Sequence, residues 1–371
     1  MSQLVLICAG GTGGHLFPAE ALARALAGRG WTVHLATDHR VDAYAQDFPA
    51  EAIHIIPSAT ITRSPVAAAK AIVRLARGWF AARKLIRQLK PVIAIGFGGY
   101  PTVPPMLAAS QARIPTIVHD QNAVLGRANR FLAKRMTAIA TAFDKVKGAE
   151  EFVARVVETG NPVRAAVLEA AKAPYPERDA DQPFRLLAFG GSQGARFLSD
   201  LVPAAAAKLS ETARGRLVVT QQCRPEDIDR VAKAYRALGV AAELESFFSD
   251  MPRRIAASHL VVSRSGASTV AELAVIGRPA IMVPLPHALD QDQKANASIL
   301  ARAGGGWMIE QGDMNPDRLA GDLEDLIAHP ERTAAAAAAA RSVGRPNAVD
   351  NLADLVEKVA GEKQANGKTD T

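Results

Sequence analysis

Short apolar segments alternate with longer stretches of helical periodicity along the whole 371-residue chain. In the first half, the segments that predict strands are Leu4–Cys8, Trp31–Ala36, Ile53–Ile56, Val92–Ile95, Thr116–Val118 and Thr137–Ala140. In the second half they are Arg185–Phe189, Leu217–Thr220, Leu260–Ser263 and Ala280–Val283. Helical segments lie between most of these runs, and this alternation predicts parallel sheets of the α/β class.

The same opening occurs twice: an apolar strand, a glycine-rich loop and a helix. The first loop, AGGTGGH at residues 9–15, precedes a helix through Leu26, and the second, GGSQGAR at 190–196, precedes a helix through Leu209. A loop rich in proline and charge at 174–183 lies between them. Two such openings predict two Rossmann-like domains, whose ligands bind beyond the carboxyl ends of the strands. We therefore expect the site in a cleft between the domains.

Both glycine loops are candidate anion sites, because the N–H groups at a helix N-terminus bind anions and glycine lets a diphosphate approach closely. A tight turn without a ligand is the alternative. Neither loop fits the dinucleotide pattern G-x-G-x-x-G, since Leu16 stands where the first would need its third glycine. A nicotinamide or flavin oxidoreductase is therefore disfavoured, although Asp38 stands where a ribose-binding acid would.

Two side chains near these features are candidates for chemistry. His15 directly follows the first loop and titrates near neutral pH, so it is a candidate general base; the alternative is a histidine that caps the helix or positions a ligand. Residues 264–272 (RSGASTVAE) predict a second helix N-terminus with hydroxyl groups, another anion site. There Glu272 could accept two hydrogen bonds from a ribose diol, or serve equally well as a capping-box glutamate.

The positive charge of the chain is concentrated in one segment. The formal net charge is +7, yet residues 52–119 contain nine Lys and Arg and no acid, which leaves the rest at −2. Within 66–90, apolar positions recur at spacings of three and four beside a basic stripe, and Gly78 is a point where such a helix could be split. A basic amphipathic helix is typical of an anionic membrane surface, although the apolar stripe could also pack on the sheet.

Composition disfavours several other classes. Cys8 and Cys223 are too few for a disulfide framework or a four-thiolate zinc site, and the scattered histidines predict no metal. The first residues lack the basic region of a secretory signal, and no apolar run approaches the roughly 20 residues of a spanning helix. The basic segment lacks the interleaved aromatic side chains of a nucleic-acid-binding surface, so no nucleic acid is expected.

Seven motifs follow one another between residue 10 and about residue 300. They are GGTGGHLFP (10–18), GFGGYPTVPP (96–105), HDQNAVLGRANR (119–130), TGNPVR (159–164), FGGSQGAR (189–196), SRSGASTVAEL (263–273) and Gln293 with Asn296-Ala297. In this combination and order the chain resembles the MurG family of bacterial glycosyltransferases. The resemblance implies a GT-B fold, in which two Rossmann-like domains with parallel sheets face each other across a cleft.

The resemblance also implies the reaction. The family moves N-acetylglucosamine from UDP-N-acetylglucosamine to the C4 hydroxyl of the muramoyl sugar of lipid I, undecaprenyl-pyrophosphoryl-muramoyl-pentapeptide. The product is lipid II for peptidoglycan synthesis, formed with inversion at the anomeric carbon and without a cofactor or a protein-bound metal. Another GT-B enzyme that uses the same donor scaffold is the alternative. The expected location is the cytoplasmic face of the inner membrane, as a peripheral protein on its anionic surface.

Site residues carry over position by position from the matching motifs. His15 is implied as the base, and Tyr100 as a residue that helps to hold the acceptor. The implied substrate-binding residues are Thr12, Gly13, Gly14, Asn122, Arg164, Ser192, Phe248, Ala267, Ser268, Thr269, Val270, Ala271, Glu272 and Gln293. Phe248 stands where the family often has an aliphatic residue, and Asp120 where it often has glutamate.

The resemblance divides the chain into domains. Residues 1–163 are expected to bind the acceptor and the membrane, joined by a C-terminal helix at about 345–360 that crosses back. Residues 164–344 are expected to bind the UDP-sugar, and 361–371 to form a disordered tail.

Overall fold

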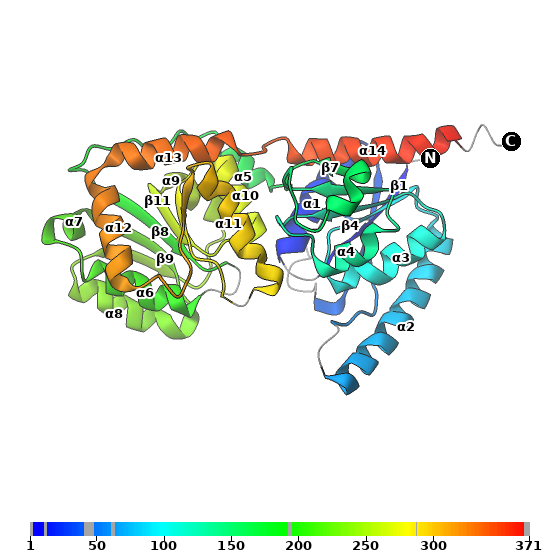
Figure 1. The fold of residues 1–371 in the computed structure, drawn as a ribbon, viewed down its shortest axis with the longest axis horizontal. Coiled ribbons are helices and arrows are strands. Elements are labelled where there is room, and N and C mark those ends of the chain that lie inside the picture. Colours follow the sequence, from blue (N-terminus) through cyan, green and yellow to red (C-terminus); the bar gives the residue numbers. More distant parts are fainter. Residues whose placement is uncertain are drawn as a thin grey trace. The chain divides into compact units, whose positions relative to one another are not determined.

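The computed structural model describes residues 3–10, 13–40, 48–60, 64–191, 195–286 and 288–366. The chain forms two compact units (Figure 1), one of Met1–Arg164 with Pro346–Thr371 and one of Ala165–Arg345. They are called the N-terminal unit and the C-terminal unit below. Each unit is built on a parallel sheet, so the α/β fold predicted from the alternation is confirmed.

The sheet of the N-terminal unit has seven strands among the described residues, in the order β3-β2-β1-β4-β5-β6-β7. These are β1 (Leu4–Cys8), β2 (Thr32–Thr37), β3 (Ala52–Ile55), β4 (Ile93–Gly96), β5 (Thr116–Asp120), β6 (Ala138–Thr141) and β7 (Val156–Glu158). The helices are α1 (Gly13–Gly28), α2 (Pro65–Leu89), α3 (Val103–Gln111), α4 (Arg127–Ala133) and α14 (Ala348–Asn366), with short turns η2 (Tyr100–Thr102) and η3 (Glu150–Arg155). Helices cover both faces, which is why the central strands are apolar at nearly every position.

The sheet of the C-terminal unit has six strands among the described residues, in the order β10-β9-β8-β11-β12-β13. These are β8 (Phe184–Phe189), β9 (Leu217–Gln222), β10 (Ala241–Glu245), β11 (Leu260–Ser263), β12 (Ala280–Met282) and β13 (Gly306–Met308). The helices are α5 (Ala165–Ala170), α6 (Arg196–Ala206), α7 (Glu211–Arg216), α8 (Ile228–Ala237), α9 (Met251–Ala257), α10 (Ala267–Ile276), α11 (Asp292–Arg302), α12 (Pro316–Ala328) and α13 (Pro330–Ser342), with turns η4 (Pro225–Asp227) and η5 (Leu289–Gln291).

The strand order reverses once in each sheet. In the N-terminal unit the chain runs outward from β1 through β2 to β3 and then returns to β4 on the other side of β1. In the C-terminal unit β8 has the same position, between β9 and β11. A parallel sheet opens at such a reversal, because the connections leave the strand ends in opposite directions. Both glycine loops follow the first strand of their sheet and so lie at these two points.

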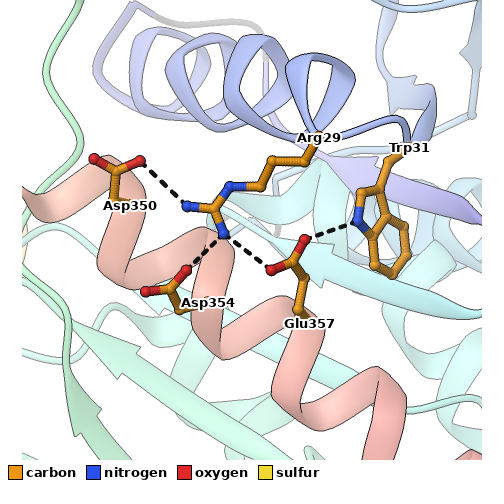
Figure 2. A network of polar contacts seen from close by, with 5 residues as sticks. All are labelled: Arg29, Trp31, Asp350, Asp354 and Glu357. Atoms are coloured by element: carbon orange, nitrogen blue, oxygen red, sulfur yellow. Dashed lines mark hydrogen bonds and ion pairs between the residues drawn. The ribbon is translucent and has the colours of Figure 1, made fainter.

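Helix α14, although last in the sequence, packs against α1 of the N-terminal unit (Figure 1). Figure 2 shows the polar side of this contact, where the Arg29 guanidinium reaches three carboxylates of α14. It lies 3.2 Å from Asp350, 2.6 Å from Asp354 and 3.0 Å from Glu357. The Trp31 indole N–H donates to the same Glu357 at 3.2 Å. The helix runs on to Asn366, into the segment that the sequence analysis assigned to a disordered tail.

Helix α2 is continuous from Pro65 to Leu89, so the expectation that Gly78 could split it is wrong. Gly78 is buried, and a Cβ atom built there would lie only 1.9 Å from the Pro57 carbonyl oxygen. The missing side chain therefore allows the helix to approach the loop after β3 closely. Ala82 and Ile86, on the inner side of α2, are buried against residues of β1 and β4. Part of the apolar stripe therefore packs on the sheet, as predicted.

Candidate functional site

The C-terminal unit presents two loops at its reversal point, one after β8 and one after β11. The first turns at Gly191, whose φ of +86° favours glycine. Residues 192–194 lie outside the described residues, and with them the predicted diphosphate residue Ser192. The loop after β11 leads directly into α10, whose N-cap is Gly266 without a side-chain hydrogen bond.

The N-terminus of α10 gathers several of the predicted donor residues. Ala267, Ser268 and Thr269 form its first turn. The Ser268 hydroxyl is buried and has no hydrogen-bond partner within the described part of the chain. Ser265 Oγ donates to the Gln293 carbonyl at 2.8 Å, so Gln293 is held beside this turn by its backbone. The result is an anion-binding geometry with an unsatisfied hydroxyl next to it.

Glu272 lies further along the same helix and is 9% exposed. Because the N-cap is Gly266, the N3 position of a capping box would be Thr269. Glu272 is three residues beyond that position and cannot reach back to the N-cap. The capping-box alternative is therefore wrong, and the predicted contact of Glu272 with a ribose stays a prediction. Val270 and Ala271 complete the predicted segment between the first turn and Glu272.

Arg264 is a half-buried cation at the start of this loop, and the sequence analysis gave it no role. Its guanidinium donates to the carbonyls of Val283 at 3.0 Å and Pro284 at 3.2 Å and to Gln311 Oε1 at 2.6 Å. Burial lowers the pKa of Arg264 from its ordinary value. These contacts tie the loop after β11 to the loop after β12. Only the fold brings these partners together, so no local signal identified the residue.

Phe248 is buried, and the Arg254 guanidinium carbon lies 4.1 Å from its ring centroid. Asp250 and Glu243 hold Arg254 from the other side, at 2.6 and 2.5 Å. The Phe248 side chain is thus packed beneath this cation. That arrangement suits the expectation that Phe248 would present its backbone to a ligand.

In the N-terminal unit, His15 lies in the first turn of α1, after Gly13 and Gly14, while the predicted Thr12 lies outside the described residues. The loop after β4 packs against the imidazole. Cβ atoms built at Gly98 and Gly99 would lie 3.4 Å from His15 Cε1 and 3.5 Å from Cδ2. Both glycines have positive φ angles, +87° and +78°. The backbone conformation therefore disfavours side chains at both positions beside the imidazole.

His15 is also the end of a buried hydrogen-bond chain. Its Nδ1 lies 3.1 Å from Gln121 Oε1, and Gln121 Nε2 lies 3.1 Å from His119 Nδ1. His119 Nε2 in turn lies 2.9 Å from the Gly160 carbonyl oxygen. Gln121 and His119 are 2% and 0% exposed, and burial lowers the pKa of His119 to about 4. The imidazole of His119 is therefore neutral within this hydrogen-bond chain.

Asp120, a residue that departs from the family pattern, shapes the next loop. Its carboxylate accepts backbone N–H groups of Asn122 at 3.0 Å and Gly126 at 2.8 Å and the Asn129 side-chain amide at 3.0 Å. Burial raises the pKa of Asp120, and these hydrogen bonds oppose the rise. The shorter side chain is therefore fully engaged in holding the loop that carries the predicted donor contact Asn122.

Two further predicted residues lie in the N-terminal unit. The Arg164 guanidinium carbon stacks 4.4 Å from the Phe17 ring centroid, on the helix that also carries His15. Tyr100 begins η2, directly after the two glycines beside the imidazole. The structure thus brings His15, Tyr100 and the loop of Asn122 to the same strand ends. Within the described residues, histidine, cysteine and carboxylate side chains form no group of three that could hold a metal ion.

Comparison with known proteins agrees with this architecture. Residues 5–141 match the glycosyltransferase family 28 N-terminal domain and residues 185–352 its C-terminal domain. A "UDP-N-acetylglucosamine--N-acetylmuramyl-(pentapeptide) pyrophosphoryl-undecaprenol N-acetylglucosamine transferase" of Mesorhizobium japonicum is 56% identical over 363 residues, which is 97% of this chain and 96% of that protein. The chain belongs to this transferase family. A relative of the same name from Methylobacterium sp. (strain 4-46) is 58% identical and covers 96% of this chain and 97% of its own.

Solved structures confirm the fold. The crystal structure of Acinetobacter baumannii MurG matches with a TM-score of 0.79 at 29% identity, over 96% of this chain and 100% of that one. The glycosyltransferase of kitacinnamycin matches with a TM-score of 0.70 at 18% identity, over 97% of this chain and 100% of that one, and this likeness shows the fold alone. The GT-B expectation and the assignment as a glycosyltransferase are both confirmed.

Proposed function

We propose that the protein transfers N-acetylglucosamine from UDP-N-acetylglucosamine to the C4 hydroxyl of the muramoyl sugar of lipid I, giving lipid II with inversion at the anomeric carbon. The observation that carries the proposal is the 56% identity to a transferase of that name over 97% of the chain. That likeness extends over both units, so it includes every motif of the candidate site.

The C-terminal unit supplies the donor site in this proposal. The α10 N-terminus and the glycine loop after β8 receive the diphosphate, and Glu272 accepts hydrogen bonds from the ribose hydroxyls. Gln293 contacts the sugar, and Phe248 offers its backbone to the uracil. The helix N-terminus and the Arg164 guanidinium stabilise the negative charge that develops on the leaving diphosphate.

The N-terminal unit supplies the acceptor site and the base. His15 removes the proton of the attacking hydroxyl, while Tyr100 and the glycine loops hold the acceptor. Direct inversion needs such a base because the hydroxyl is a weak nucleophile until it loses its proton. Loss of a general base typically slows a reaction about 100- to 10,000-fold.

Transfer of radiolabelled N-acetylglucosamine to a short-chain lipid I analogue tests the proposal, in buffer with EDTA. We expect the wild type to transfer, His15→Ala to be slow but to retain UDP binding, and Glu272→Ala to bind UDP more weakly. Donor binding without glycosylation of lipid I would refute the acceptor assignment and favour another GT-B activity.

We further propose that α2 docks the enzyme on an anionic membrane surface. Val66, Val73 and Phe80 recur every seven residues along the helix and are 67%, 54% and 65% exposed. Lys70 and Arg77 lie between them on the same face, so exposed apolar and basic side chains alternate. Within the described residues, no helix has the length and hydrophobicity of a membrane span. A surface-bound helix reconciles this finding with a lipid-linked acceptor.

Sedimentation with vesicles tests the docking surface. Replacing Lys70, Arg74 and Arg77 with glutamine should weaken partition into phosphatidylglycerol vesicles by on the order of 100-fold, since each charge contributes about 1 kcal/mol. Val73→Ser should weaken binding as well. Val153→Ser is the matched control. Val153 is similarly exposed, at 72%, but lies on η3 and not on α2. Equal binding of all variants would contradict the assignment.

A further inference from the structure

We propose that Gln121 and His119 are positioning residues that fix the tautomer of His15, so that Nε2 carries the lone pair that receives the proton of the acceptor hydroxyl. The inference rests on the proposed role of His15 as the base. It follows from the direction of each hydrogen bond in the buried chain that ends at His15.

The direction is set first at the Gly160 carbonyl oxygen, which can only accept. His119 Nε2, 2.9 Å away, must therefore carry the hydrogen of this bond. His119 is fully buried, and its pKa of about 4 keeps the ring neutral near pH 7. A neutral imidazole has one N–H, so His119 Nδ1 is an acceptor.

The orientation of the Gln121 amide follows from the acceptor at His119 Nδ1. The amide end facing inward lies 3.1 Å from His119 Nδ1 and 3.1 Å from the Phe97 carbonyl oxygen. Both partners accept only, so this end must be the NH2 group, which donates twice. The reversed amide would place its oxygen against a carbonyl oxygen and a nitrogen lone pair, at the cost of two buried hydrogen bonds. The amide oxygen therefore points to the other side.

That oxygen lies 3.1 Å from His15 Nδ1 and can only accept. His15 Nδ1 must therefore carry a hydrogen, and in the neutral ring the lone pair is then on Nε2. The ring lies beside Gly98 and Gly99, where an added Cβ atom would come within 3.4 and 3.5 Å of it. A ring rotated by 180° would present carbon to Gln121 and lose the hydrogen bond.

The tautomer determines which nitrogen works in the reaction. The hydroxyl proton moves to His15 Nε2 as the acceptor oxygen forms its bond to the anomeric carbon. The bond from that carbon to the diphosphate oxygen breaks, and UDP leaves with the electron pair. His15 becomes an imidazolium whose Nδ1–H remains on Gln121. Gln121 stays neutral throughout, so its contribution is orientation and not charge.

Nitrogen NMR of protein labelled with 15N-histidine tests the tautomer directly, because protonated and unprotonated ring nitrogens resonate far apart. Comparison with His15→Ala assigns the signals of His15 among the eight histidines. We expect Nδ1 of His15 to be protonated and Nε2 to be unprotonated in the neutral wild type. Protonation at Nε2 instead would overturn the inference without any use of activity.

Gln121→Met removes the hydrogen bonds of Gln121 to His15, His119 and Phe97 at nearly constant side-chain size. We expect mixed tautomers at His15 and a roughly 10- to 100-fold lower kcat, about the cost of a misplaced reacting group, with KM for UDP-N-acetylglucosamine unchanged. Gln221→Met is the matched control: Gln221 is fully buried, donates to Leu198 and accepts from Tyr235 in the C-terminal unit. It should lose stability but keep kcat and the His15 spectrum.

The outcomes separate this inference from the proposed function. An unchanged His15 spectrum and kcat in Gln121→Met would overturn the positioning role. If wild-type protein transferred no sugar to lipid I, the proposed function would fail, and the role of the tautomer in the reaction would fail with it. The NMR spectrum would still report whether the hydrogen-bond chain sets the His15 tautomer.

Discussion

At the scale of single residues, Gly98 shows how closely backbone conformation and chemistry are linked. Its φ of +87° strains any other residue, and a Cβ would lie 3.3 Å from Asn129 Nδ2 and 3.4 Å from His15 Cε1. We expect the backbone strain in Gly98→Ala, together with the tight approach to Asn129 Nδ2, to shift the loop beside the imidazole and to lower kcat by about 10- to 100-fold.

Gly30→Ala is the control for that experiment. Gly30 has nearly the same φ, +85°, but nothing within 4 Å of its Cβ position. Both variants should lose about 1 kcal/mol of stability from the backbone strain, measured by urea unfolding. Equal activity of the two variants would show that the contact with His15 is unimportant.

The burial of His119 predicts a pH dependence of stability. Its pKa is about 4 in the folded protein against an ordinary value of 6.5, so between these values the unfolded state binds more protons. Stability should therefore be fully present above pH 6.5 and fall as the pH decreases toward 4, by on the order of 3 kcal/mol for this group. His119→Asn should flatten the pH dependence of stability measured by urea unfolding.

From the sequence we could predict candidate residues that follow a glycine loop, but not residues whose contacts depend on distant partners. His15 and Glu272 were identifiable from their place after strand and loop. The roles of Gln121 and Asp120 depend on what faces them, for example the Phe97 carbonyl and the Gly126 N–H. The order of the motifs identified the segment 119–130 as part of the candidate site. It could not predict the direction of the hydrogen bonds that this segment makes.

At the scale of elements, most strands that the apolar pattern predicted are buried, although the predicted edge strand β3 is half exposed. β1 and β11 agree at both ends with Leu4–Cys8 and Leu260–Ser263. The pattern missed β7, β10 and β13, all at sheet edges. β10 reads AAELE and is mostly exposed. Such strands are held by hydrogen bonds to one neighbour, which leave little trace in side-chain hydrophobicity.

The contact of α2 with the loop after β3 gives a prediction at this scale. Gly78→Ala should destabilise the N-terminal unit by about 1–3 kcal/mol, the usual cost of overpacking, because the new methyl group meets the Pro57 carbonyl. Gly321→Ala in α12 is the matched control, since nothing lies within 4 Å of its Cβ position. It should stabilise by about 0.5–1 kcal/mol. Thermal melting that shows both variants unchanged would contradict the close packing.

At the scale of the whole molecule, the ion pairs between Arg29 and three carboxylates of α14 attach this last helix to the N-terminal unit. We call these ion pairs the Arg29 network. The guanidinium is 28% exposed and its carboxylate partners 40–70%, so water and salt screen the ion pairs. We expect Arg29→Gln to lower the melting temperature by a few degrees at low ionic strength, and less at high salt. Arg24→Gln, which removes an ion pair within α1, should have a smaller effect. Equal effects of the two would show that the network does not fasten α14.

The return of the last helix also affects how the chain folds during synthesis. Leu352, Ala353 and Val356 are fully buried in the N-terminal core, yet a ribosome adds them after the entire C-terminal unit. Domains generally fold in the order in which they emerge. Here the second unit is an insertion within the first and can be complete while the first still has an open core. The nascent N-terminal sheet must therefore leave part of one face uncovered until α14 has followed the C-terminal unit out of the ribosome.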